Sequence, residues 1–431
     1  MADFEPPAWA SGDQRRAADG TVPQATPPDP GISPTGSAPD TGRHHALEPA
    51  PGEPAPGQPA AAQAHADCQH ANGQRAGWDG QAFVPANAYR QAYAAIDLGT
   101  NNCRLLVARP SGDHFVVVDA FSRVVRLGEG LSQTGRLSDV SMERALAALH
   151  VCAEKLRKRN VHLARSVATE ACRRATNGAA FIDRVHAETG IRLDIITAQE
   201  EARLAVLGCH ILLEQGEGPA MIFDIGGGST ELVLVDPQGT VPRIIDWQSV
   251  PWGVVSLTES IGPIADSGQA RAVAYADMRA RVDDAFAPFV ERIAGARKTG
   301  VAQGNIRLLG TSGTVTTLAS VYLELPHYDR SAIDGLVVPA EAMRGVSQRM
   351  ARMSLAERVA LPCIGRERSD LVVAGCAILE SILDVWPATR LGIADRGIRE
   401  GILRSLMASE GVAERSRAAL RDLRRDRESR A

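Results

Sequence analysis

The sequence predicts an α/β protein made of two duplicated domains that face each other across a central cleft. The chain of 431 residues exceeds the usual size of one domain. Apolar, strand-like runs open each half, and helical periodicity follows them. A strand–turn–strand motif also occurs twice without a gap, 127 residues apart. We therefore expect domain I over residues 91–215 and domain II over residues 216–410.

Both ends of the chain differ in composition from these domains. Residues 1–90 contain 14 of the 25 prolines, mixed with Gly, Ala, Gln and Asp, and show almost no aliphatic periodicity. Such a segment cannot bury enough apolar surface to offset its ordering entropy, so we predict a disordered N-terminal extension. The stretch 411–431 is strongly charged, and we interpret it as a solvated helix or frayed tail.

Composition excludes several classes of protein. The formal net charge of -4 gives no electrostatic basis for binding nucleic acid. The N-terminus lacks the pattern of a signal peptide, and no window approaches 18 uninterrupted apolar residues, so no membrane association is expected. The seven cysteines are scattered and form no C-x-x-C pair, which argues against a disulfide framework or a zinc site. We expect a cytoplasmic protein.

The predicted elements follow the same order in both domains. Domain I opens with three strands, predicted by the runs AYAAIDLGT, CRLLVARP and HFVVVDAF. A helix over 138–157 with Ser138 as its cap, the strand SVATEA, a helix over 179–189 and the strand LDIIT follow. Domain II repeats the opening with AMIFDIG, STELVLVD and RIIDWQSV, and continues with a helix over about 268–295 and the strands in IRLLGTSGTV and RLGIAD.

The duplicated motif carries the chemistry. Asp97-Leu98-Gly99-Thr100-Asn101 in the first copy matches Asp224-Ile225-Gly226-Gly227-Gly228 in the second. Glycine lets backbone N–H groups approach a ligand closely, and hydroxyl or amide side chains add donors, so each turn suits phosphate oxygens. The aspartate at each strand end offers a hard oxygen that suits Mg²⁺. The predicted phosphate-binding residues of the two turns are Gly99, Thr100, Asn101, Gly226, Gly227, Gly228, Ser229 and Thr230.

A dinucleotide-binding loop is the competing interpretation of GGGST. That loop requires a helix directly after it, whereas ELVLVD follows here and favours a hairpin. A third turn, with Gly310, Ser312 and Gly313, leads from a strand into a predicted helix, whose free N–H groups also suit an anion.

An acid on the helix between the two motifs is the candidate base. Thr197-Ala198-Gln199-Glu200 has the form of a capping box, with Thr197 as N-cap and Glu200 at the third helical position. Its neighbour Glu201 points about 100° further round the helix and is free to face the cleft. Glu201 is therefore the better candidate for a general base.

The sequence as a whole resembles the exopolyphosphatase and guanosine pentaphosphate phosphohydrolase family. The segments AAIDLGTNNCRLLVAR, VATEACRRATN, IITAQEEARLAVLG, FDIGGGSTELVLVD, LLGTSGTVTTLASV and RGIREGIL occur in the order and spacing of that family, over about 92–405. The resemblance implies two ribonuclease H-like domains of the actin, Hsp70 and sugar-kinase superfamily. Longer relatives append an all-helical HD-like domain, so the resemblance is to the short form, and residues 1–90 have no counterpart in the family pattern.

The resemblance also implies roles for individual residues. Glu201 matches the glutamate that activates the attacking water, and Arg173 matches the arginine that pairs with phosphate. Asp224 and Glu231 fall near Mg²⁺, with Asp97 on the opposite side. The implied reaction is Mg²⁺-dependent release of terminal phosphate from polyphosphate, and the implied assembly is a homodimer. Cys103 and Arg104 receive no role.

Three alternatives stay open at this level. Hydrolysis of the 5′ γ-phosphate of guanosine pentaphosphate (pppGpp) uses the same chemistry, and the motifs do not separate the two substrates. A kinase or chaperone of the same superfamily would need an adenosine pocket. A sensor of polyphosphate or alarmone would need no base, and the presence of Glu201, Asp224 and Glu231 argues against it.

Overall fold

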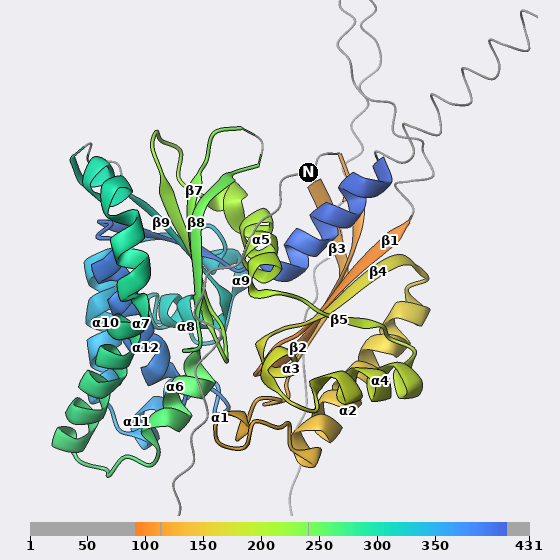
Figure 1. Ribbon diagram of the computed structural model, residues 1–431, viewed down its shortest axis with the longest axis horizontal. Helices are drawn as coiled ribbons and strands as arrows, with labels where there is room; N and C mark the ends of the chain where they lie inside the picture. The colour runs from red at the N-terminus through yellow and green to blue at the C-terminus, as the bar shows by residue number, and fades with distance from the viewer. Residues whose placement is uncertain (1–90, 113, 240, 303, 305, 412–431) are drawn as a thin grey trace, which may run out of the picture. The chain divides into compact units, whose positions relative to one another are not determined.

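The computed structural model describes residues 91–411, except 113, 240, 303 and 305 (Figure 1). The predicted extension 1–90 and all but the first residue of the tail 411–431 lie outside the described residues. Within the described part of the chain, no helix is both long enough and apolar enough to cross a membrane.

The first sheet is built from the strands of the N-terminal half, in the order β3-β2-β1-β4-β5. Its central strand β1 is antiparallel to β2 and parallel to β4. The strands are β1 (Ala92–Leu98), β2 (Asn102–Ser111), β3 (His114–Val124), β4 (Val161–Ala168) and β5 (Leu193–Ile195). The three predicted opening strands are confirmed, and the first turn is a hairpin.

The second sheet repeats this arrangement and adds one strand, in the order β10-β11-β9-β6-β7-β8. As in the first sheet, its β6 is antiparallel to β7 and parallel to β9. A register shift lies between Val107 and Ala108 in the first copy and between Leu234 and Val235, the corresponding positions, in the second. The strands are β6 (Ala220–Ile225), β7 (Thr230–Asp236), β8 (Arg243–Val250), β9 (Arg307–Thr311), β10 (Val337–Pro339) and β11 (Arg390–Ala394). The duplication and the hairpin after Asp224 are confirmed.

Helices cover one face of the first sheet and form its core. Ser138 caps the principal helix as predicted, because its side chain accepts a hydrogen bond from the Ser141 N–H. Leu146 and Leu149 of this helix pack with Phe181 of α4 and the inward side chains of the strands. The helices of this half are α1 (Leu131–Thr134), α2 (Asp139–Lys158), α3 (Glu170–Arg174) and α4 (Gly178–Thr189).

A larger helical layer covers the second sheet. Phe223, Phe286, Phe289 and Trp386 are fully buried in the core between them. The predicted helix over 268–295 is longer than expected and runs to residue 302. The helices are α6 (Val254–Ile261), α7 (Gly268–Ala302), α8 (Ser312–Tyr322), α9 (Arg330–Ile333), α10 (Ala340–Arg352), α11 (Leu355–Val359) and α12 (Val372–Val385).

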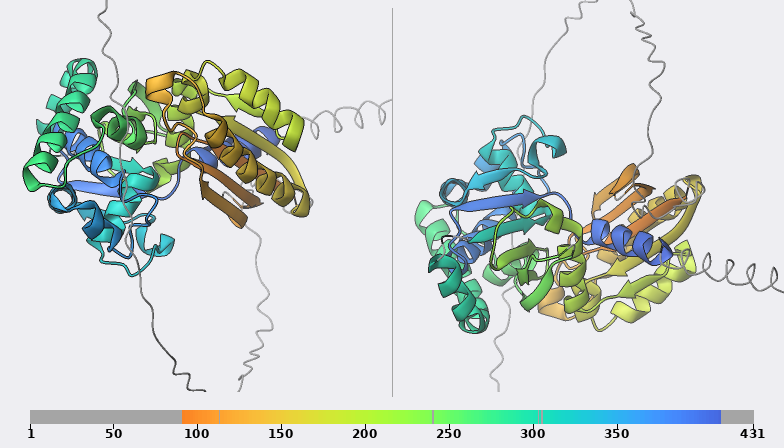
Figure 2. Two further views of the ribbon diagram at one scale, coloured as in Figure 1. Left: turned by 90° about the horizontal axis from the view of Figure 1, so that it is seen from below. Right: turned by 90° about the horizontal axis from the view of Figure 1, so that it is seen from above.

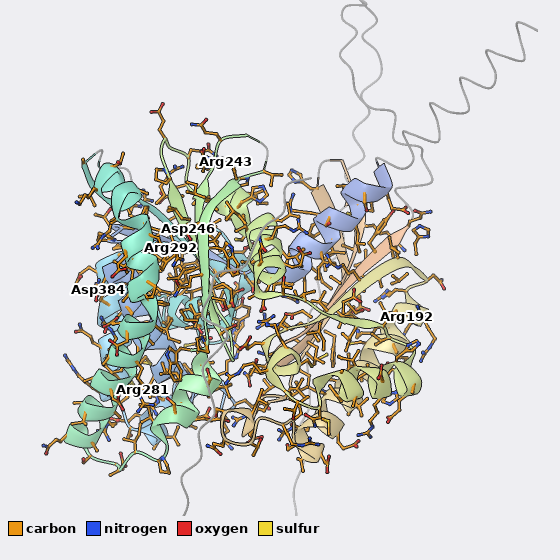
Figure 3. All side chains as sticks on the ribbon, viewed as in Figure 1. Arg192, Arg243, Asp246, Arg281, Arg292 and Asp384 are labelled. Atoms are coloured by element: carbon orange, nitrogen blue, oxygen red, sulfur yellow. The ribbon has the colours of Figure 1, made fainter. Side chains whose placement is uncertain are left out.

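An ion pair fastens the long helix α7 to the edge of the second sheet. Arg292 of α7 and Asp246 of β8 lie next to each other in Figure 3, with Arg292 Nε 3.1 Å from Asp246 Oδ2. Both side chains are partly exposed, so the pair contributes at most about 1 kcal/mol to stability. Its effect is to orient the helix along the strand.

Each sheet and the helices that cover it form one lobe of the molecule. Two further helices pack against the lobe opposite to the one that precedes them in the chain. The helix α5 (Ala198–Cys209) packs against the second sheet, whereas the final helix, residues 398–411, packs against the first. Figure 2 shows this final helix beside the first strands of the chain. The two helices cross in backbone contact: a Cβ atom on Gly208 would lie 1.9 Å from the Gly397 carbonyl oxygen, and one on Gly401 would lie 2.0 Å from that of Leu204.

Candidate active site

One cleft receives both glycine-rich turns. It has a volume of about 1110 Å³, part of which is open to solvent, and it also contains the start of α8 and the segment after β11. Most of the predicted site residues line it: Asp97, Gly99, Thr100, Asn101, Glu201, Asp224, Gly226, Gly227, Gly228, Ser229, Glu231, Ser312 and Gly313. Three predicted residues, Arg173, Thr230 and Gly310, are not part of the lining.

The first turn presents polar atoms that lack partners. The Gly99 N–H donates to the Asn102 carbonyl oxygen at 2.9 Å and closes the turn. Among the described residues, no group bonds to the buried Thr100 Oγ1, Asn101 Oδ1 or Asn102 Oδ1. Buried polar atoms of this kind are normally satisfied by protein, water or a ligand. The turn is therefore suited to hold a polar ligand.

The second turn has the same geometry and lies against the first. The Gly226 N–H donates to the Ser229 carbonyl oxygen, also at 2.9 Å. A Cβ atom on Gly228 would lie only 2.6 Å from Thr100 Oγ1, and one on Gly227 only 3.0 Å from Thr100 Cβ. The glycines are thus required because the two turns approach each other so closely.

The third turn differs from its prediction in one residue. Ser312 adopts a left-handed φ of 81°, and its hydroxyl donates to the Ile225 carbonyl oxygen at 2.6 Å, which ties the start of α8 to the second turn. Gly310 instead lies within β9, where a Cβ atom would be 2.5 Å from the ring of Phe223. This glycine is explained by packing and does not face the cleft.

Thr230 is also occupied elsewhere. Its hydroxyl donates to the Trp252 carbonyl oxygen at 2.6 Å, and its side chain is buried at the beginning of β7. The hydroxyl therefore fixes the segment that precedes α6.

Glu201 is buried at the wall of the cleft, with an exposed fraction of 7%. Arg173 donates to its Oε2 from Nη1 and Nη2, each at 3.1 Å. Among the described residues, no hydrogen bond reaches the other oxygen, Oε1. Burial, followed by the negative charge of Glu231, raises the pKa of Glu201 well above its ordinary value, and Arg173 opposes the increase. A raised pKa suits a general base.

Arg173 lies behind this acid. A guanidinium has five N–H groups, and all five of Arg173 donate within the protein. Nε and Nη2 each donate one bond to Glu170 Oε2, and Nη1 donates one to the Ile196 carbonyl oxygen. The other two bonds, from Nη1 and Nη2, reach Glu201. In this arrangement Arg173 has no N–H group left for a phosphate.

The three predicted metal ligands, Asp97, Asp224 and Glu231, line the cleft, where Glu231 is buried and the two aspartates are half-buried. Burial raises the pKa of Asp224 to about 6, and burial together with the charge of Asp224 raises that of Glu231 to about 7. The hydroxyls of Ser229 and Ser249 donate to Glu231 Oε1 at 2.7 and 2.8 Å. Within the described residues, however, no three His, Cys, Asp or Glu side chains come close enough together to form a metal site by themselves.

Sequence reasoning assigned no role to the four arginines that line the cleft, Arg104, Arg368, Arg396 and Arg399. Arg104 and Arg368 both line it, and neither has an ion pair within 4 Å among the described residues. In the strand register of the first hairpin, Arg104 lies opposite Asp97, and in the second hairpin Glu231 lies opposite Asp224 in the same way. The repeat therefore marked the position of Arg104 as one that could face the cleft. Arg368 lies outside every recognised motif and had no such signal.

Thr197 is the N-cap of α5, as predicted, and its side chain accepts a hydrogen bond from the Glu200 N–H. The reciprocal half of the capping box is wrong. The Glu200 carboxylate binds Arg165 at 3.0 Å and Arg203 at 2.7 Å, because these cations compete with the backbone for it. Glu200 therefore lies in a network outside the cleft.

The sequence and the fold are similar to those of known proteins. A family model described as the Ppx/GppA phosphatase family matches residues 106–410. Exopolyphosphatase 2 of Mycobacterium tuberculosis is 30% identical over 326 residues, which are 73% of this chain and 98% of the relative. A crystal structure described as an exopolyphosphatase-like protein is 30% identical, with a TM-score of 0.63, over 73% of this chain and 97% of that one. The Aquifex aeolicus member of the Ppx/GppA family is 26% identical, with a TM-score of 0.58, over 74% and 98% of the two chains.

Proposed function

Because the chain belongs to the Ppx/GppA phosphatase family, we propose that it is an exopolyphosphatase that releases terminal orthophosphate from inorganic polyphosphate. The observation that carries this proposal is the position of Glu201. Its carboxylate is held on one oxygen by Arg173 and faces a cleft lined by both glycine-rich turns. A binding protein has no use for a base at that point, whereas a hydrolase requires one.

The proposed reaction is an in-line attack of water on the terminal phosphorus. Glu201 Oε1 accepts the proton of the water, while Arg173 keeps the carboxylate in place. The remaining N–H groups of the two turns and the hydroxyl of Thr100, which has no partner among the described residues, donate to the phosphate oxygens. Donors fixed before the reaction stabilise the charge that develops in the transition state. The remaining chain leaves as a polyphosphate that is one phosphate shorter.

The acids of the cleft fit a Mg²⁺ ion that is shared with the substrate. Mg²⁺ is usually bound by one or two carboxylates together with phosphate oxygens, so a group of three protein ligands is unnecessary. Asp97 and Asp224 would hold it, and Glu231, whose Oε1 already accepts two hydroxyls, would act through water. The ion would neutralise phosphate charge.

The cations of the cleft support a substrate with several phosphates. Arg104, Arg368 and Arg399 all line the cleft, and among the described residues none of the three is in an ion pair within 4 Å. Guanidinium groups match phosphate oxygens well in geometry and charge. Three such cations in one cleft suit an extended polyanion.

The test is an assay of phosphate release from long polyphosphate and from guanosine pentaphosphate, each with Mg²⁺ and with EDTA. We expect release from polyphosphate that depends on Mg²⁺. Glu201→Gln should lower kcat by about 10²- to 10⁴-fold while polyphosphate still binds. Release from the nucleotide alone would replace the proposed substrate, and full turnover by Glu201→Gln would refute the proposed base.

A further inference from the structure

The contacts of Arg173 single out a second acid beside Glu201. Glu170 is the first residue of α3, and its carboxylate lines the same cleft. Its Oε2 accepts from Arg173 Nη2 at 2.6 Å and from Nε at 3.1 Å. Glu170 thus binds the edge of the guanidinium formed by Nε and Nη2, and Glu201 binds the edge formed by Nη1 and Nη2.

Glu170 is itself fixed by the second glycine-rich turn. A Cβ atom on Gly228 would lie 3.0 Å from Glu170 Cγ, so the stem of the side chain packs directly against that turn. The carboxylate also lies 3.7 Å from Arg174. Glu170 thus joins the turn of the second lobe to a guanidinium of the first.

Glu201 has no other anchor of this kind. Within the described residues, both hydrogen bonds of its carboxylate come from Arg173 and end on Oε2. Without Glu170, the Arg173 Nε–H would lose its acceptor, and besides Glu201 itself only the Ile196 carbonyl oxygen would still hold the guanidinium. Glu201 would then move with it.

We propose that Glu170 is a positioning residue for the hydrolysis: it holds Arg173, and through Arg173 it holds Glu201 with Oε1 open to the cleft. This inference rests on the proposed function. Because Glu170 acts through Glu201, its loss lowers kcat and leaves KM and the Mg²⁺ activation constant in place. A misplacement of about 1 Å in a reacting group can lower turnover on the order of 10²-fold.

The experiment compares Glu170→Ala, Glu170→Gln and Glu201→Gln, with polyphosphate as substrate and binding measured separately. Glu170→Ala should lower kcat by roughly 10- to 10²-fold with KM unchanged. Glu170→Gln keeps an oxygen acceptor for Nε–H and should fall between the wild type and the alanine variant. The double variant Glu170→Ala/Glu201→Gln should be no slower than Glu201→Gln alone, since both changes remove the same function.

Glu200→Ala is the matched control. Glu200 precedes Glu201 on α5 and also binds two arginines, but outside the cleft, so kcat should not change. The proposal would be wrong if the losses of kcat multiplied in the double variant. It would also be wrong if Glu170→Ala or Glu170→Gln changed KM or the Mg²⁺ activation constant, because Glu170 would then touch substrate or metal. A wild type that releases no phosphate contradicts the proposed function, whereas full kcat in Glu170→Ala contradicts only this inference.

Discussion

Arg104 and Arg368 approach Gly313 from opposite lobes at the start of α8. A Cβ atom on Gly313 would lie 3.6 Å from Arg104 Nη2 and 3.4 Å from Arg368 Nη1. Burial, and next the like charge of Arg104, lower the pKa of Arg368, and its Nη1 donates only to Thr317 at 3.1 Å. Two cations held this close beside a helix N-terminus form a site that favours an anion.

Substrate affinity should therefore depend on these arginines. We expect Arg104→Ala and Arg368→Ala each to lower kcat/KM by roughly 10- to 100-fold, chiefly through KM, because a hydrogen bond to a charged group is worth about 1.5–3 kcal/mol. Initial rates over a range of polyphosphate concentrations measure this. Arg184→Ala, which removes a surface cation paired with Glu143 and Glu188, should leave both constants unchanged. Equal KM in all three variants would contradict the assignment.

The rate should rise with pH along an acid limb set by Glu201. Burial and Glu231 raise the pKa of Glu201 above its ordinary 4.5, so we expect the limb of log(kcat/KM) at a higher pH than a free glutamate would give. Arg173 lowers this pKa, and Arg173→Gln should therefore move the limb to still higher pH. The profiles are measured at saturating Mg²⁺. A limb that does not move in Arg173→Gln would show that another group titrates.

The half-buried Asp224 should cost stability when no metal is bound. Its pKa rises from 3.8 to about 6 in the folded protein, so the folded state holds the proton more tightly and stability falls as pH rises between these values. Asp224→Asn removes this penalty. In EDTA at pH 8 the variant should be more stable than the wild type by up to about 3 kcal/mol, at roughly 1.4 kcal/mol per pKa unit.

Chemical denaturation at pH 4 and pH 8 measures this difference, which should nearly vanish at the lower pH. Asp119 serves as a control of opposite sign, because Lys155 and Arg159 lower its pKa to about 2. That shift stabilises the fold above pH 3.8 and the benefit is lost as pH falls towards 2, so Asp119→Asn should destabilise the protein at pH 8. A lower stability of Asp224→Asn in EDTA at pH 8 would overturn the prediction.

The crossing of α5 and the final helix should tolerate no side chain. Gly401→Ala places a Cβ atom about 2.0 Å from the Leu204 carbonyl oxygen, and we expect a loss of about 1–3 kcal/mol of unfolding free energy. Gly345→Ala, inside α10 with open space around it, should instead stabilise by about 0.5–1 kcal/mol. Thermal and urea denaturation separate the two. Similar effects of both changes would show that the crossing can relax.

Local patterns predicted much of this molecule. The two hairpins followed from apolar runs around an Asp-(Leu/Ile)-Gly turn, and the cap at Ser138 followed from a residue type whose hydroxyl satisfies a free N–H group. The matching register of the repeat also predicted that both turns would enter one cleft. These features depend on residues that are close in sequence or on a comparison of the chain with itself.

Contacts between distant residues were harder to predict. No spacing in the sequence indicates that Arg368 meets Arg104 or that the five N–H groups of Arg173 are all occupied within the protein. Gly310 resembled a phosphate-binding glycine, but the ring of Phe223 fills the space above it. Tertiary packing decided these cases, and the sequence pattern alone carries no information about it.

The exchange of helices means that the described chain passes between the lobes twice, once before α5 and once after β11. Both passages lie beside the cleft, because Glu201 of α5 and Arg399 of the final helix are among its lining residues. These two covalent connections hold the lobes together beside the cleft, and they resist sliding of one lobe past the other.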